Sequence, residues 1–206
     1  PDDQSVADQI ACFETAALAV VDAGLEPAVR HLANTAAALG YPTSHFDLVR
    51  LGIGLYGVHP STPGSAAALG LTPVMTLRSR LALVKVIPAG QSVSYGSAWT
   101  APSATRVGLV PVGYADGIPR AASGRADVLV RGVRCPVLGR IAMDQFVIEL
   151  DDRIGDVSAG DDVVIFGDET SGAPTAADWA VASDSIGYEI VTRVSSRVPR
   201  RYVGAP

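Results

Sequence analysis

The residues of this sequence that could do chemistry lie in a few short stretches. These stretches are residues 33–35, 49–53, 112–117, 139–145 and 186–190, the last followed by 196–200. Thr35 offers a hydroxyl beside a predicted helix start, and Gly52 lets a ligand approach the backbone, so that the amides of Gly52 and Ile53 could donate to an anion. A plain helix cap at Thr35 and a strand-end bend at Gly52 remain alternative interpretations.

Arg50 and Tyr114 are polar side chains that need particular neighbours to act. Arg50 lies in the apolar run 48–53, where an unpaired charge is costly, and this favours a specific acceptor over a surface arginine at a strand end. The phenol of Tyr114 has an ordinary pKa of about 10, so it needs cationic neighbours to act as a base at neutral pH. A half-buried aromatic side chain on a strand is the alternative interpretation of Tyr114.

The elements that must position these residues begin with an α/β pattern. Apolar residues at helical spacing predict a helix over residues 5–24, and the runs 28–33 and 48–53 are typical of short strands. Between the two strands, residues 34–35 can cap a small helix over residues 36–39. The order helix, strand, helix, strand indicates an α/β unit with parallel strands.

After a linker rich in Ser, Pro, Gly and Ala over residues 61–70, the pattern changes to a period of two along residues 77–86. Further strand-like runs are residues 106–112, 126–130, 134–138, 145–150 and 162–166, with a turn at Arg131 and Gly132. One helix, capped by Thr175, is expected to run to about residue 183. The predicted fold class is therefore α/β followed by a mostly-β, barrel-like domain, divided into residues 1–70 and 71–206.

Composition excludes several classes of function. A net charge of −5 without a basic run disfavours a nucleic-acid partner, and no apolar stretch approaches the ~20 residues of a membrane span. The cysteines, Cys12 and Cys135, form no CxxC motif, and the three histidines are scattered, so we expect two buried thiols in a reducing compartment and no metal site. The chain lacks an initiator Met, and two or three strands cannot close a parallel core, so we expect it to be a piece of a longer protein.

Together and in this order, the five stretches resemble the second half of alanine racemases. The resemblance covers nearly the whole chain and implies the last strands of an (α/β)8 barrel, followed by the C-terminal β domain of that family. It also implies pyridoxal 5'-phosphate (PLP) as cofactor, bound at the barrel mouth.

The resemblance assigns the cofactor contacts residue by residue. Positions that hold the phosphate are matched by Thr35, Gly52, Ile53 and Tyr188, and Asn34 is assigned to the cofactor site beside them. Thr35 stands where the family usually has serine, and the hydroxyl is kept. Arg50 matches the arginine that faces the pyridine nitrogen, which it would leave largely unprotonated because a guanidinium only donates hydrogen bonds.

Tyr114 matches the second catalytic base, a tyrosine that in this family comes from the partner subunit of a homodimer. Met143 and Asp144 match residues beside the carboxylate of the substrate alanine, again from the partner subunit. Arg140 and Ile186, together with Tyr188, match the entry channel that limits substrate size. The implied activity is two-base racemisation of alanine in the cytoplasm, supplying D-alanine for peptidoglycan.

The resemblance also shows what this chain lacks. The Schiff-base lysine of the family belongs to an upstream motif, as do the arginine that pairs with the substrate carboxylate and the histidine that supports the tyrosine. The only lysine, Lys85, lies in an alternating strand pattern and cannot take that position. We therefore expect residues 1–206 alone not to racemise alanine.

Two other functions fit the same residues. One is a serine or broad-specificity racemase of the same fold, because channel packing sets substrate size. The other is a non-catalytic interaction module built on the β domain, which predicts no special use for Tyr114.

Overall fold

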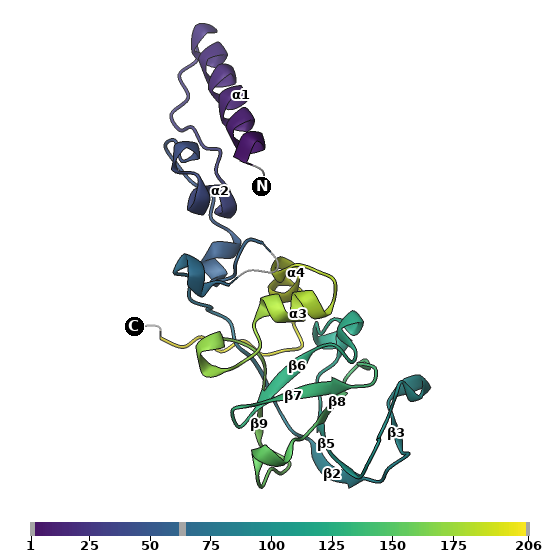
Figure 1. The fold of residues 1–206 in the computed structure, drawn as a ribbon. Helices are drawn as coiled ribbons and strands as arrows, with labels where there is room; N and C mark the ends of the chain where they lie inside the picture. Colours follow the sequence, from purple (N-terminus) through teal and green to yellow (C-terminus); the bar gives the residue numbers. More distant parts are fainter. Residues whose placement is uncertain (1–2, 62–64, 205–206) are drawn as a thin grey trace.

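The computed structural model describes residues 3–61 and 65–204 of the chain. It is elongated, with a helical N-terminal part at one end, a curled β-sheet at the other, and two short helices between them (Figure 1). The helices in the described residues are α1 (Asp3–Asp22), α2 (Thr35–Gly40), α3 (Ala176–Ala182) and α4 (Gly187–Thr192). None of the helices in this described part is long and apolar enough to cross a membrane.

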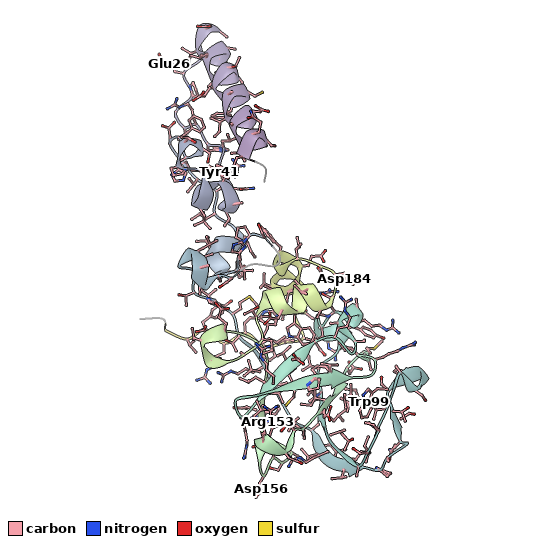
Figure 2. The ribbon with its side chains drawn as sticks, viewed as in Figure 1. Glu26, Tyr41, Trp99, Arg153, Asp156 and Asp184 are labelled. Atoms are coloured by element: carbon pink, nitrogen blue, oxygen red, sulfur yellow. The ribbon has the colours of Figure 1, made fainter. Side chains whose placement is uncertain are left out.

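Helix α1 confirms the predicted first helix, displaced by two residues toward the N-terminus. The chain leaves the helix through Gly24, whose φ of 79° favours glycine. Tyr41 lies beside the start of α1 (Figure 2), and its hydroxyl donates to Asp3 Oδ1 at 2.6 Å. The rings of Phe13 and Phe46 also pack with centroids 4.8 Å apart. These contacts tie α1 to the chain that follows it.

Two regular strands were predicted in the α/β part, and this prediction is wrong, but the predicted parallel direction of the two segments is confirmed. Residues 28–33 and 48–53 form one isolated parallel bridge, between His31 and Leu48. On either side of it, the Arg30 carbonyl accepts from the Asp47 amide and the Ala33 carbonyl accepts from the Arg50 amide. A parallel strand in a barrel pairs on both edges, whereas these segments pair only with each other in the described chain, and the ladder stays short.

The C-terminal part is an antiparallel sheet. Its strands are β1 (Leu77–Arg80), β2 (Leu83–Ile87), β5 (Thr105–Val110), β6 (Asp127–Val130), β7 (Val133–Leu138), β8 (Phe146–Glu149) and β9 (Asp162–Phe166). They pair in the order β1-β9-β6-β7-β8-β5-β2, and a separate hairpin joins β3 (Ser92–Val93) to β4 (Trp99–Thr100). Trp99 marks this hairpin in Figure 2, beside the sheet. The hairpin was not predicted, because its strands are only two residues long.

The sheet is curled, and its connectivity explains why. Strands β1 and β2 are consecutive in the chain but lie at opposite ends of the sheet. Only Leu81 and Ala82 separate them. The Leu81 amide donates to the Asp161 carbonyl, next to β9 at one end of the sheet, and the Ala82 amide donates to the Leu109 carbonyl of β5 at the other end. The sheet must bend until its two edges meet at this point. The barrel-like domain is confirmed, whereas the prediction of one alternating run over residues 77–86 is corrected to two strands.

Two short helices cover one side of the sheet (Figure 1). Trp179 of α3 is buried, its indole donates to the Ile165 carbonyl at 2.6 Å, and its ring lies 6.5 Å from that of Phe146. The predicted capping of α3 by Thr175 is confirmed, since its hydroxyl accepts from the Asp178 amide. Helix α4 was not predicted, and the expectation of one helix in this part of the chain is wrong. Six residues are too few to give a clear helical period.

Short 3-10 helices occupy several connections. They are Pro42–Ser44, Ile53–Tyr56, Ala67–Leu69, Tyr95–Ser97, Tyr114–Asp116, Arg120–Ala122, Asp152–Ile154 and Glu169–Ser171. The predicted linker over residues 61–70 contains one of them, and residues 62–64 lie outside the described residues. The predicted turn between β6 and β7 is confirmed, because Arg131 and Gly132 both have positive φ, at 48° and 81°.

Candidate functional site

The first group of candidate residues surrounds the hydroxyl of Thr35. This side chain is buried, and its Oγ1 accepts from the amides of Gly52 at 3.1 Å and Gly54 at 3.3 Å. Asn34 caps α2 through a hydrogen bond from the Ala37 amide. Space beside Gly52 is open, since a Cβ built there meets nothing within 4 Å. The Gly52 amide, which was expected to donate to an anion, donates to Thr35 Oγ1 instead. The Thr35 hydroxyl still has a proton to donate, and it lies next to this accessible stretch of backbone.

Arg50 lies at the end of the short parallel pair, with its Nη1 2.6 Å from Nδ1 of His31. A guanidinium can only donate, so Nδ1 of His31 is the acceptor of this hydrogen bond. This contact orients Arg50 without neutralising its charge. Sequence reasoning missed His31, although the parallel pairing of 28–33 with 48–53 was a signal that the two side chains would be neighbours.

The start of α4 packs against the chain that follows the Thr35 group. A Cβ built on Gly187 would lie 2.7 Å from Cγ1 of Val58, so the helix approaches that segment as closely as glycine allows. Ile53 and Val58 belong to the same buried apolar cluster as Ile190 of α4. The side chain of Ile53 is thus buried in the core, and this packing fixes the position of its backbone.

Ile186 and Tyr188 flank Gly187 at this start of α4, and both are partly exposed. Their side chains are therefore available at the surface beside the segment that follows Ile53. The structure brings these two residues to the side of the molecule that carries the first group.

The second group is built on two turns that bond to each other. The amide of Tyr114 donates to the Ala142 carbonyl and that of Ala115 to the Met143 carbonyl, both at 3.0 Å. A Cβ at Gly113 would lie 2.3 Å from those two carbonyl oxygens, so only glycine permits this approach. Tyr114 begins a 3-10 helix after β5 has ended, and its side chain is 41% exposed. It is therefore not a strand aromatic.

Charged side chains join the same two turns. Asp116 is buried, and its Oδ2 accepts from the Gly113 amide at 2.9 Å. Arg197 places its Nε 3.4 Å from Asp116 Oδ1 and its Nη2 2.9 Å from Asp144 Oδ1. These contacts raise the pKa of Arg197, first through the hydrogen bond to Asp144 and then through the charge of Asp116. Asp116 was not singled out from the sequence, and Arg197 was noted only within a motif.

Arg140 lies beside the second group, in a hollow that it lines with Ser94, Tyr95 and Ala142. Ser94 donates its hydroxyl to the Arg140 carbonyl. The backbone of Ser94 has φ 65° and ψ 177°, a region that is essentially restricted to glycine. Sequence reasoning missed Tyr95, which follows this strained residue and is 71% exposed.

The structure therefore gathers the predicted residues into two sets. The first set comprises Asn34, Thr35, Arg50, Gly52 and Ile53, with Ile186 and Tyr188 on the adjoining helix. The second comprises Tyr114, Arg140, Met143 and Asp144. Ile186 and Tyr188 adjoin the first set through the packing of Gly187 on Val58, and Arg140 adjoins the second through the hollow that it shares with Ala142. None of the contacts given above joins one set to the other. Among the described residues, no group of three or more His, Cys, Asp or Glu side chains is placed to hold a metal ion.

Comparison with known proteins shows that two family descriptions match this chain. The description "Alanine racemase, N-terminal domain" matches residues 1–60, and "Alanine racemase, C-terminal domain" matches residues 74–202. The chain belongs to the alanine racemase family. A relative named alanine racemase from Streptomyces coelicolor is 53% identical over 205 residues, which cover 98% of this chain and 52% of that protein. One from Frankia casuarinae is 50% identical over 204 residues, covering 98% of this chain and 53% of that protein.

Solved structures of alanine racemases have the same fold. That from the D-cycloserine producer Streptomyces lavendulae superposes with a TM-score of 0.95 at 52% identity, covering 100% of this chain and 54% of that one. The Bacillus anthracis alanine racemase with bound L-Ala-P gives a TM-score of 0.84 at 33% identity, covering 96% of this chain and 51% of that one. The chain thus spans about half the length of the alanine racemases that it matches.

Proposed function

We propose that the complete protein containing this chain racemises alanine, with PLP as cofactor and an active site shared between the two subunits of a homodimer. The observation that carries the proposal is the exposed phenol of Tyr114, held on a turn whose backbone bonds to the turn of Met143. A tyrosine fixed at the surface by two backbone hydrogen bonds is suited to act on a group supplied by another subunit.

The residues of the first set fit the cofactor. The hydroxyl of Thr35 keeps a proton that could be donated to a phosphate lying against the open backbone at Gly52, and Asn34 caps the adjoining helix α2. Arg50, oriented by His31, presents a fixed donor to an aromatic ring nitrogen. Bound PLP would supply an electron sink that makes the proton on Cα of the amino acid removable.

The residues of this chain would then transfer the proton, bind the substrate carboxylate and restrict the size of the substrate. Tyr114 removes or returns the Cα proton on one face of the substrate, and the base on the other face is a lysine outside this chain. The amide of Met143 donates to the substrate carboxylate, with Asp144 beside it, while Arg140, Ile186 and Tyr188 restrict substrate size. Because Arg50 only donates hydrogen bonds, it would leave the pyridine nitrogen of bound PLP largely unprotonated.

The two sets act together only across a subunit boundary in this proposal. Residues 1–70 form the end of the (α/β)8 barrel, residues 71–206 form the β domain, and the tyrosine of one subunit serves the barrel of the other. The exposed apolar side chains of Leu18, Val21 and Leu25 on and after α1 are surfaces that the rest of a barrel would cover. We further propose a cytoplasmic enzyme that supplies D-alanine for peptidoglycan, and that residues 1–206 alone are inactive.

The test uses the complete protein, purified with PLP and assayed for racemisation of L-alanine and D-alanine. Tyr114→Phe should lower kcat by about 10²–10⁴-fold, since it removes a general base, while the dimer and the absorbance of bound PLP persist. Racemisation by Tyr114→Phe at the wild-type rate would contradict the proposal and favour a non-catalytic β domain. Turnover of alanine, serine and lysine by the wild-type protein distinguishes alanine racemase from the broader racemase.

A further inference from the structure

Arg197 makes contacts with both turns of the second set. Its guanidinium bridges Asp116, in the Tyr114 turn, and Asp144, in the Met143 turn, at 3.4 and 2.9 Å. The planar and permanently charged guanidinium of Arg197 therefore connects the turn of Tyr114, the proposed base, to the turn of Met143, whose amide is proposed to bind the substrate carboxylate.

The segment that carries Arg197 is itself fixed against the Tyr114 turn. The Ser195 amide donates to the Asp116 carbonyl at 2.9 Å. A Cβ built on Gly117 would lie 2.5 Å from the Arg193 carbonyl oxygen, so the two chains are in close contact there. Arg200 donates to the carbonyls of Val194 and Val198, which closes the segment around Arg197.

Asp116 completes the connection from Arg197 to the base. One of its oxygens faces Arg197 and the other accepts from the Gly113 amide at 2.9 Å, one residue before Tyr114. Loss of the guanidinium would leave this buried carboxylate with only its backbone donor and would leave Asp144 without a counter-ion at this contact. The two turns could then shift relative to each other, which would move the phenol with respect to the substrate carboxylate.

We propose that Arg197 is a positioning residue for the racemisation reaction, which it serves by fixing the Tyr114 turn against the Met143–Asp144 turn. This inference rests on the proposed function. Arg197 need not touch substrate or cofactor, so its removal should reduce the rate of the proton transfer made by Tyr114 more than the affinity for alanine. A misplacement of about 1 Å at a reacting group costs on the order of 100-fold in rate.

The experiment compares Arg197→Ala and Arg197→Lys in the complete, PLP-loaded protein. Arg197→Ala should lower kcat about 10- to 100-fold with KM changed about threefold or less, because orientation and not binding is lost. Arg197→Lys keeps the charge but cannot reach both carboxylates with one ammonium, so its kcat should lie between those of Arg197→Ala and the wild-type protein. If Arg197→Ala does not fold, Arg197→Lys still allows the test.

The deciding measurement is the primary deuterium isotope effect with Cα-deuterated L-alanine and D-alanine. A displaced Tyr114 should raise the isotope effect for the enantiomer whose proton the tyrosine removes, and not for the other. A merely structural role would leave both isotope effects unchanged, and that result overturns the inference. The matched control is Arg80→Ala, which removes an exposed arginine paired with Asp162 at 3.3 Å on β1 and should behave as wild type.

The same assay separates the two proposals. A wild-type protein that does not racemise alanine overturns the proposed function and the role of Arg197 with it. A wild-type protein that racemises alanine and loses this activity in Tyr114→Phe, while both Arg197 variants match wild type, overturns only the role of Arg197.

Discussion

At the scale of single residues, the alternative interpretation of Thr35 as a plain helix cap is wrong, because Asn34 caps α2. Thr35 is the first residue of the helix, and its hydroxyl oxygen accepts from the amides of Gly52 and Gly54. A Cβ added at Gly54 would lie 2.9 Å from Cγ2 of Thr35, so the methyl group is packed as well. The geometry of the proposed phosphate site is therefore built into the fold before any ligand binds.

Thr35→Val tests this role directly. Valine keeps the shape but removes the acceptor of the Gly52 and Gly54 amides. Because Gly52 is exposed and Gly54 is only half-buried, water can replace part of the loss, and we expect a cost of about 0.5–1.5 kcal/mol of unfolding free energy. Thr35→Ser keeps the hydroxyl and should cost clearly less. Chemical denaturation of both variants measures the difference, and equal stabilities would show that the hydroxyl contact contributes nothing.

Cys135 provides a prediction on pH. Burial, assisted by the charge of Asp151, raises the pKa of the Cys135 thiol from its ordinary 9.0 to about 11. The folded thiol therefore stays neutral while the unfolded one ionises, so its contribution to stability is complete below pH 9 and is lost as the pH rises toward 11. Cys135 is buried as expected, whereas the expectation of a buried thiol is wrong for Cys12, which is exposed. At pH 8, iodoacetamide should therefore modify Cys12 and spare Cys135 until the chain unfolds. Equal labelling of both thiols in the folded protein, read by mass spectrometry, would contradict this.

At the scale of elements, the site depends on loops held by a rigid sheet. Strand β5 ends at Val110 and β8 begins at Phe146, and these two residues are paired in the sheet. The turns that carry Tyr114 and Met143 leave from this pair and remain bonded to each other beyond it. Because the pairing of β5 with β8 sets where both turns start, the sheet determines which backbone groups can meet.

Gly113→Ala should break this contact between the two turns. The added methyl group would lie 2.3 Å from two carbonyl oxygens, while the φ of −145° at Gly113 is open to any residue, so the cost is steric. We expect a loss of about 3 kcal/mol in unfolding free energy and a displaced Tyr114 turn. Gly40→Ala is the matched control, because a Cβ there meets nothing within 4 Å. Thermal denaturation decides, and equal melting temperatures for the two variants would contradict the expectation.

At the scale of the whole molecule, the two sets of site residues lie on parts of the chain with different architectures. The first set lies in the helical N-terminal part, apart from Ile186 and Tyr188 at α4, and the second lies on turns of the curled sheet. Helices α3 and α4 lie between the two parts (Figure 1). Glycine at position 187 lets α4 approach Val58, and the shared apolar core holds the joint. An active site divided between subunits would need such a joint, because a change in its angle would displace Tyr114 from the partner subunit's barrel.

A mixing experiment tests the divided site. Complete proteins carrying Tyr114→Phe or Arg50→Glu should each be nearly inactive, since each lacks one half of every site. After subunit exchange in equal amounts, half of the dimers are mixed and each has one intact site, so about one quarter of wild-type activity should return. No recovery, with exchange verified by mass spectrometry, would place Tyr114 and Arg50 in the same subunit's site.

The sequence by itself determined the fold class, the family resemblance and the α3 cap, because these follow from periodicity and from motifs that are local in the chain. The contact of His31 with Arg50, the curling of the sheet and the bridge from Asp116 through Arg197 to Asp144 were decided by tertiary structure. Each joins groups that are 19 or more residues apart, so no local propensity reports them. Residues 28–33 and 48–53 also do not form regular strands, because the hydrogen bonds of a strand depend on neighbouring strands that its own residues do not specify.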